Sequence, residues 1–186
     1  MQIPLPQPEL HSSRLRLREV RQDDAAALYD IHSDPVVMRY WSYPAWTELA
    51  QAEQKVADIL SQRRAQEILV WAIADKASDQ LIGTAVAFAL NRDQGRAEIG
   101  YSLRRDRQGQ GLAVEAMRLI VPYLFDVLEL RRLEADIDPR NAASCRLVET
   151  LGFVREGVLR ERWRVNGEIT DTALYGLLER DFRRGE

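Results

Sequence analysis

The chain has 186 residues, of which 46% are apolar and 30% are charged, and its formal net charge is −3 at pH 7. This size predicts one domain with a sizeable core, and the acidic balance argues against nucleic-acid binding, which needs a basic surface. No run reaches the roughly 18 apolar residues of a membrane helix, and no signal-peptide pattern opens the chain. The lone cysteine, Cys145, excludes an intrachain disulfide and favours no metal site. We therefore expect a cytoplasmic protein without membrane or nucleic-acid partners.

Prolines predict an extended arm over residues 1–9, because each proline fixes φ and removes a backbone donor. We expect the remaining residues, 10–186, to form a single domain. Leucines that alternate with arginines predict a half-buried strand over residues 13–20. Asp23 and Asp24 then suit the start of a short helix.

A second helix is expected after an aromatic and irregular segment at residues 36–46. Thr47 is a suitable cap for this helix, because its hydroxyl can accept from a free backbone amide. The spacing of Ala50, Gln54, Ala57 and Leu60 or Ser61 indicates a loosely defined packed face.

Three runs of β-branched and aromatic residues predict strands before a long helix. They cover residues 68–74, 81–90 and 96–103. The helix that follows keeps its apolar period from Leu112 to Val127 across Pro122, so we expect a kink at the proline rather than an end.

The last third of the chain predicts a strand, a helix and a long hairpin. After a strand at residues 132–137, Asn141 is a good cap for a helix that Gly152 ends. Asn166-Gly167 is a strong hairpin signal between two further strands. The order is therefore β-α-α-β-β-β-α-β-α-β-β, which predicts an α/β protein with a mixed sheet and helices on both faces.

The most informative segment is the bend Arg107-Gln108-Gly109-Gln110-Gly111-Leu112-Ala113, between a strand and the long helix. Its two glycines let the backbone approach a ligand closely. Free amides and the helix dipole at this point favour a phosphate or diphosphate. A plain turn with convenient glycines is the alternative. A dinucleotide fingerprint would require Gly or Ala in place of Val114, and a P-loop would require a lysine.

The bend and two further motifs resemble the GCN5-related N-acetyltransferases (GNAT). Gln108-x-x-Gly111-x-Ala113 fits the Q/R-x-x-G-x-G/A motif of that family, and the segment from Glu98 to Leu103 is similar to its fourth strand. Asn141-x-x-Ser144-x-x-Leu147, followed by Leu151-Gly152-Phe153, resembles a later helix of the family. The best match is the branch with the ribosomal-protein alanine N-acetyltransferases. The resemblance implies an acyl-CoA N-acyltransferase fold whose central strands splay apart around the pantetheine arm of acetyl-CoA.

The resemblance also implies acetyl-CoA as cosubstrate, with no metal. Main-chain amides of the bend would hold its diphosphate, and the free edge of the preceding strand would pair with its arm. The residues expected to bind acetyl-CoA are Tyr101, Ser102, Leu103, Gln108, Gly109, Gln110, Gly111, Leu112, Ala113 and Asn141.

Two side chains are the catalytic candidates. Glu98 is the candidate base that takes the proton of an amine, directly or through water; its alternative role is an ordinary solvated position on a strand. Ser144 is the candidate donor to the leaving thiolate, with Tyr175 as the second choice; its alternative role is to fill a helical turn. Aromatic residues are expected to wall the acceptor pocket, although such residues more often seal a core edge. They are Trp41, Tyr43, Trp46, Trp163 and Tyr175.

These expectations describe an N-acetyltransferase, monomeric or homodimeric, that moves an acetyl group directly from acetyl-CoA to a primary amine. The acceptor is either a protein N-terminus or a small amine such as a polyamine, an amino acid or an aminoglycoside. A non-catalytic acyl-CoA-binding module and a nucleotide-binding enzyme are the alternatives from other classes.

Overall fold

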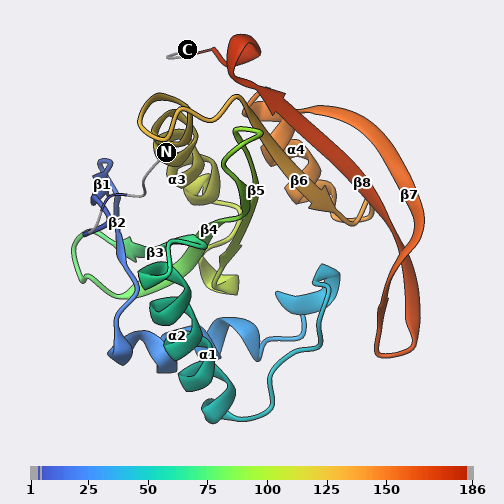
Figure 1. The fold of residues 1–186 in the computed structure, drawn as a ribbon. Helices are drawn as coiled ribbons and strands as arrows, with labels where there is room; N and C mark the ends of the chain where they lie inside the picture. The colour runs from blue at the N-terminus through green and yellow to red at the C-terminus, as the bar shows by residue number, and fades with distance from the viewer. Residues whose placement is uncertain (1–3, 5, 184–186) are drawn as a thin grey trace.

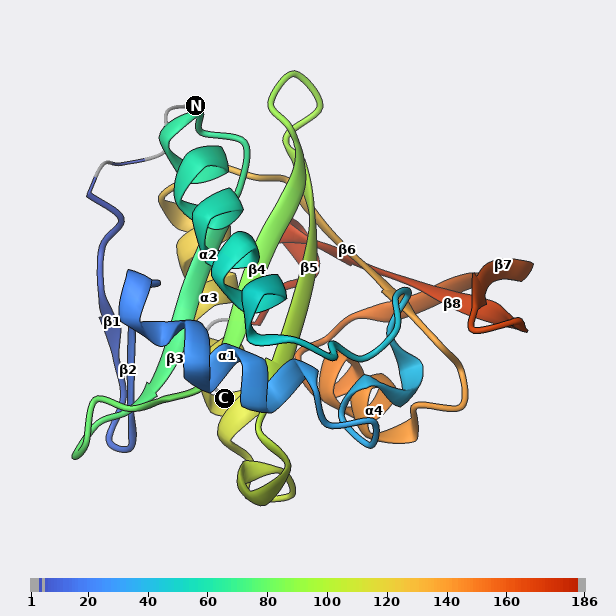
Figure 2. The same ribbon diagram turned by 90° about the horizontal axis from the view of Figure 1, so that it is seen from below.

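The computed structural model describes residue 4 and residues 6–183. Within these residues an eight-stranded sheet has two helices on each face (Figure 1 and, from below, Figure 2). The helices are α1 (Ala25–His32), α2 (Leu49–Arg64), α3 (Leu112–Asp126) and α4 (Ala142–Thr150). The strands are β1 (Leu10–His11), β2 (Leu15–Glu19), β3 (Leu69–Asp75), β4 (Leu81–Asn91), β5 (Arg96–Leu103), β6 (Arg132–Ile137), β7 (Val154–Val165) and β8 (Glu168–Leu178). The predicted order is confirmed, and the short strand β1 is added before it.

The strands lie in the order β1-β2-β3-β4-β5-β6-β8-β7, and β5 and β6 form the one parallel pair among the described strands. A parallel pair needs a crossover, which α3 supplies on one face of the sheet. The adjoining helix α4 covers the same face, whereas α1 and α2 cover the other. The sheet is therefore buried on both sides at its centre, and every residue of β3 from Leu69 to Ala74 is buried.

The parallel pairing of β5 and β6 stops after three residue pairs. Arg96 pairs with Arg132, Ala97 with Leu133, and Glu98 with Glu134. Beyond Glu98, β5 pairs only with β4, while β6 pairs only with β8. The two strands thus separate (Figure 1), as the resemblance predicted, and the edge of β5 facing β6 is unpaired from Ile99 onward.

The start of α1 differs from the expectation. Asp23 and Asp24 lie in a 3₁₀ turn, and α1 begins after them at Ala25. The Asp24 carboxylate accepts two hydrogen bonds from the buried Arg18 guanidinium, each at 2.8 Å. A buried arginine requires a carboxylate partner, so Asp24 is held by β2 rather than by the helix.

The packed face predicted for α2 was wrong at Ala50, Gln54 and Ala57, while Leu60 is partly buried against the core. Ala52, Val56 and Ile59 are the buried residues of this helix, whereas Ala50 and Ala57 are exposed. The buried set follows helical spacing and offers more apolar area to the sheet than two alanines and a glutamine. The cap also differs, because α2 starts at Leu49 with Glu48 in the N-cap position and not Thr47.

Other local predictions are confirmed. The long helix α3 continues through Pro122, although it ends at Asp126, before the exposed Val127. Asn141 Oδ1 accepts from the Ser144 amide at 3.1 Å and so caps α4. Asn166 and Gly167 both have positive φ, at 49° and 83°, as a tight hairpin turn requires.

Part of the proposed N-terminal arm is described. Residues 1–3 and 5 lie outside the described residues. Gln7 is buried, and its side chain donates to the Val70 carbonyl of β3 at 3.2 Å. The boundary between an arm at residues 1–9 and a domain at 10–186 stays a prediction. No helix in the described part of the chain is long and apolar enough to cross a membrane.

Candidate active site

The glycine bend presents open backbone amides at the start of α3. Gly109 and Gly111 have φ values of +72° and +75°, a region that suits glycine, and Gly111 is the N-cap of the helix. The first amide with an internal partner is that of Glu115, which donates to the Gly111 carbonyl at 3.0 Å. Among the described residues, none accepts from the amides of Gly109 through Val114. This is the arrangement that binds a phosphate group at a helix N-terminus.

Two glutamine side chains fix the shape of the bend. Gln108 Nε2 donates to the Leu103 carbonyl at 3.0 Å, and Gln110 Nε2 donates to the Asp106 carbonyl at 2.9 Å. Both amide groups therefore point back toward the end of β5 and the turn after it. The geometry gives Gln108 a positioning role, while the backbone of the bend remains exposed.

The free edge of β5 is joined to α4 through one side-chain contact. The Tyr101 hydroxyl lies 2.6 Å from Ser144 Oγ, across the start of α4. Burial raises the pKa of Tyr101 to about 12, although its hydrogen bond with Ser144 acts in the opposite direction. The structure thus brings together Tyr101, Ser144 and the capping Asn141, three residues that the sequence proposed for separate roles. Ser102 instead faces β4, where its hydroxyl lies 3.0 Å from that of Thr84.

Glu98 lies where β5 and β6 separate, because it is the last β5 residue that pairs with β6. Burial raises its pKa to about 7; the negative charges of Asp136 and Glu134 add to the shift, and Arg162 opposes it. In the described part of the chain, no group donates a hydrogen bond to the Glu98 carboxylate. A carboxylate that titrates near neutral pH can take a proton at that pH.

Asp136 on the neighbouring strand β6 is a further residue of this site that was not among the candidates from the sequence. Its Oδ1 accepts from Trp163 Nε1 at 3.3 Å and from the hydroxyl of the buried Thr172. Asp136 and Glu134 occupy alternate positions of β6, with Ala135 buried between them. Since Glu134 pairs with Glu98, both residues share one face of the sheet with Glu98. The alternation of acidic and apolar residues along β6 was the signal in the sequence that could have placed Asp136 on the same face as Glu134.

Three of the predicted acceptor aromatics gather around the buried His32. The His32 ring stacks on Trp46 with centroids 4.6 Å apart and meets Trp41 edge-on at 5.2 Å. The Tyr43 hydroxyl lies 3.1 Å from His32 Nδ1. Burial, with a smaller effect from Lys55, lowers the pKa of His32 to about 4, so the ring is neutral near pH 7.

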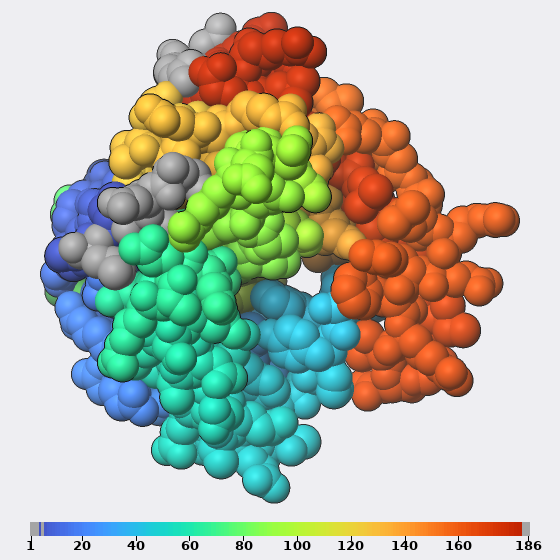
Figure 3. All heavy atoms as spheres, viewed as in Figure 1, coloured from blue at the N-terminus to red at the C-terminus, as the bar shows by residue number. Residues whose placement is uncertain are grey.

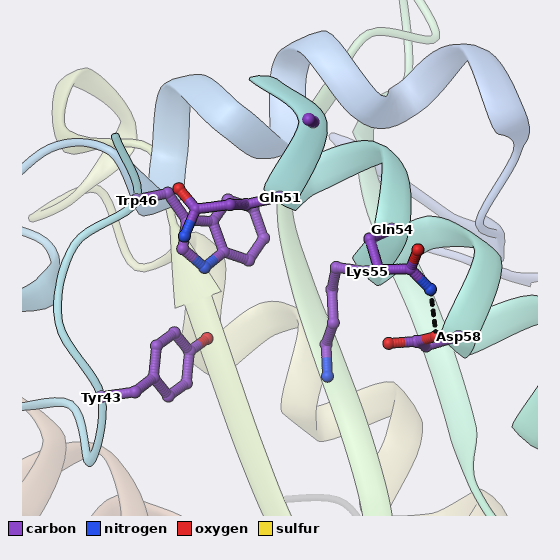
Figure 4. Close-up of a pocket in the computed structure, with 7 residues that line it drawn as sticks. Tyr43, Trp46, Gln51, Gln54, Lys55 and Asp58 are labelled. Carbon is purple, nitrogen blue, oxygen red and sulfur yellow. Dashed lines mark hydrogen bonds between the residues drawn. The ribbon is translucent and has the colours of Figure 1, made fainter. Parts of the chain in front are cut away.

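A pocket of about 500 Å³ lies between this aromatic segment and α2 (Figure 4). Tyr43 and Trp46 form one wall, and Lys55 and Asp58 of α2 lie opposite them. The space-filling view shows a hollow on this face, bordered by α2, the segment after α1, β4–β5 and the β7–β8 hairpin (Figure 3). A substrate can therefore reach the sheet from this side.

The structure does not bring Tyr175 to the other acceptor aromatics. Its register places it opposite Ala135 of β6, in the core beneath α4, where its hydroxyl donates to Glu149 at 3.0 Å. Trp163 differs from Tyr175, because its indole donates to Asp136 on the face of the sheet that also carries Glu98. Tyr175 is thus remote from the face of Glu98, and its predicted place in the acceptor pocket is corrected.

A model of the acetyltransferase (GNAT) domain matches residues 14–154. The chain belongs to the GNAT family. The N-acetyltransferase p20 of Bacillus licheniformis is 35% identical to it over 176 residues, which are 93% of this chain and 97% of the relative. Spermidine N(1)-acetyltransferase of Escherichia coli (strain K12) is 30% identical over 164 residues, 87% of this chain and 83% of the relative.

Solved GNAT structures share the fold. The crystal structure of spermidine N-acetyltransferase from Vibrio cholerae in complex with CoA and spermine has a TM-score of 0.81 and 22% identity to this chain. The match covers 91% of this chain and 98% of that structure. The family match and the relatives together show that this GNAT chain is an N-acetyltransferase that uses acetyl-CoA.

Proposed function

We propose that this enzyme acetylates a primary amine by direct transfer, with Glu98 as the base. The observation that carries the proposal is the position of Glu98 at the last pair of the parallel ladder, together with its pKa of about 7. The amine nitrogen attacks the thioester carbon, the carbon–sulfur bond breaks, and CoA leaves as its thiolate. Glu98 accepts the proton that the amine loses, directly or through water.

The glycine bend and the free edge of β5 hold acetyl-CoA in this proposal. The open amides from Gly109 to Ala113 bind the diphosphate. The pantetheine arm lies along β5 beside Tyr101, Ser102 and Leu103, where the parallel pairing has stopped and main-chain groups are available. This arrangement directs the thioester toward Glu98 and the separation of the strands.

The hydroxyl pair Tyr101–Ser144 supplies a proton or a hydrogen bond to the leaving thiolate. The pair lies between β5 and α4, beside the proposed path of the arm. Tyr175, the other candidate, is engaged with Glu149 in the core beneath α4. Asn141 acts with the pair by fixing the first turn of α4.

A small cationic amine of the polyamine class is the acceptor that the site favours. Asp136 and Glu98 place two carboxyl groups on the face where the amine must enter, beside Arg162, and these carboxyl groups attract an ammonium group when they are ionised. The spermidine N(1)-acetyltransferase of Escherichia coli, at 30% identity, supports the same class. A protein N-terminus is the second candidate, because the hollow in Figure 3 is open to the outside of the molecule.

Release of free CoA from acetyl-CoA tests this function. The panel contains spermidine and spermine, peptides with different first residues, amino acids and an aminoglycoside. We expect the polyamines to raise thiol release well above hydrolysis, with the acetylated amine detected by mass. If CoA binds but no amine increases thiol release, the enzyme proposal fails and the acyl-CoA-binding module is favoured.

A further inference from the structure

A second pocket, of about 440 Å³, adjoins the glycine bend. It forms where the start of β2, the turn between β3 and β4, and the beginning of α3 meet. Gln110 and Leu112 of the bend are part of its wall. The pocket therefore shares residues with the proposed diphosphate site without being part of the face that carries Glu98.

Cations predominate among the charged side chains of this pocket. Arg14, Lys76 and Arg107 line it, and Asp75 is the one acidic residue among its lining side chains. Arg14 is engaged already, because it forms an ion pair with Glu115 of α3 and donates to the Gln110 carbonyl at 3.1 Å. Arg14 thus secures the bend to β2.

The other two cations are less tightly engaged: Lys76 has no ion-pair partner among the described residues, and Arg107 forms only long ion pairs. Lys76 Nζ donates to the Ser12 carbonyl at 2.6 Å, and this neutral group leaves the ammonium charge uncompensated. Arg107 Nη1 lies 3.6 Å from Asp75, and Arg107 Nε lies 3.8 Å from Asp106, both longer than a hydrogen bond. An anion that enters the pocket therefore finds one ammonium without a carboxylate partner, and one guanidinium whose ion pairs are long enough to leave it able to donate.

The chemistry of CoA provides such an anion. Besides its diphosphate, CoA carries a phosphomonoester on the ribose, which has a charge of roughly −1.5 to −2 at pH 7. The ribose separates the two phosphate groups by only a few bonds. Arg14 Nη2 lies 3.9 Å from the position that a Cβ on Gly111 would occupy, so the pocket is within reach of a diphosphate held on the bend.

We infer that Lys76 and Arg107 form a subsite for the 3′-phosphate of CoA, and this inference rests on the proposed function of the bend. Arg107 is the first residue of the bend, before its open amides, and Lys76 lies in the β3–β4 turn, so the phosphate is held between two segments that are distant in sequence. The guanidinium offers paired donors to phosphate oxygens, while the ammonium acts as a point charge.

Binding of CoA and of dephospho-CoA, measured by calorimetry at one fixed ionic strength, tests the subsite. The two ligands differ only in the 3′-phosphate. The proteins are the wild type, Lys76→Ala, Arg107→Ala and the control Arg118→Ala, which removes the same charge from an exposed position of α3. We expect the wild type to prefer CoA roughly tenfold, the size of a charge-assisted hydrogen bond.

Lys76→Ala and Arg107→Ala should each lose most of this preference through weaker binding of CoA, with dephospho-CoA affinity kept within about twofold. Retained dephospho-CoA binding also reports that each variant is folded. Arg118→Ala should keep the wild-type preference. Equal affinity of the wild type for both ligands, or equal weakening of both ligands in the variants, overturns the subsite alone. Failure of both ligands to bind the wild type overturns the proposed role of the bend and the subsite with it.

Discussion

The phenolic oxygen of Tyr101 lies 2.6 Å from Ser144 Oγ and joins the free edge of β5 to the first turn of α4. The same hydroxyl reaches the Ser144 carbonyl oxygen at 3.3 Å. Because burial keeps the pKa of Tyr101 near 12, the phenol retains its proton at neutral pH. In the proposed mechanism the two hydroxyls therefore act as a single proton-donating unit beside the path of the pantetheine arm.

Removal of either hydroxyl should lower turnover. We expect Tyr101→Phe and Ser144→Ala each to reduce kcat by about 100-fold, the lower end of the range for loss of a general acid. The double variant should lose hardly more than either single variant, since the two groups act together. Steady-state kinetics measure these losses. A loss in the double variant equal to the product of the single losses would show that the residues act independently.

A side chain at Gly111 should weaken CoA binding. Its φ of +75° disfavours a β-branched residue by roughly 1–2 kcal/mol, and the bend must shift to relieve this strain. We therefore expect Gly111→Val to raise the Kd of CoA at least about tenfold. Gly157→Val is the matched control, because Gly157 has no positive φ and its Cβ would meet no atom within 4 Å. Unchanged CoA affinity in Gly111→Val contradicts the diphosphate role of the bend.

The buried pair between Arg18 and Asp24 should contribute strongly to stability. Arg18 is 3% exposed and Asp24 is 6% exposed, so loss of the carboxylate leaves a poorly compensated guanidinium in the core. We expect Asp24→Asn to lower the free energy of unfolding by about 3 kcal/mol. The exposed neighbour Asp23 provides the control, because Asp23→Asn should change the free energy of unfolding by less than about 0.5 kcal/mol. Chemical denaturation of the two variants tests this difference; similar values would exclude the pair as a major stabilising contact.

The pKa of Glu98 also predicts a pH dependence of stability. The pKa of about 7 in the folded protein lies above the ordinary glutamate pKa of 4.5, so the unfolded chain releases this proton first as the pH rises. Between pH 4.5 and pH 7 the wild type should therefore lose stability through Glu98. Glu98→Gln mimics the protonated acid and should be more stable than the wild type above pH 7 by roughly 2 kcal/mol, but not at pH 4. Denaturation curves at both pH values measure this difference, and an equal difference at both would contradict the shift.

Features that depend on local rules were predictable from the sequence. Gly111 at the start of α3, the Asn141 cap and the Asn166-Gly167 turn each follow from the backbone preferences of one or two residues. The element order followed from hydrophobic periods. The face of α2 was not predictable in this way, since its alanines fit either side of the helix and Val56 and Ile59 decide the packing.

Features that depend on strand pairing were not predictable from the residues alone. Tyr101 and Ser144 are 43 residues apart and meet only because α4 crosses beside β5. Tyr175 faces α4 because its register with Ala135 fixes its side, and a shift of one residue would reverse that side. Asp136 gains its importance from the end of pairing at Glu98, which no local pattern in β6 reveals.

The pH–rate profile of the wild type and of Glu98→Gln, with the best acceptor of the panel, tests the central claim most directly. The quantity compared is the kcat/KM of the wild type divided by that of Glu98→Gln at each pH. Because both profiles use the same amine, the titration of the acceptor cancels from this ratio. If Glu98 is the base, this ratio rises about tenfold per pH unit below pH 7 and then levels at about 100-fold or more. A ratio that stays constant across pH 5–9 would contradict a role of Glu98 as the base.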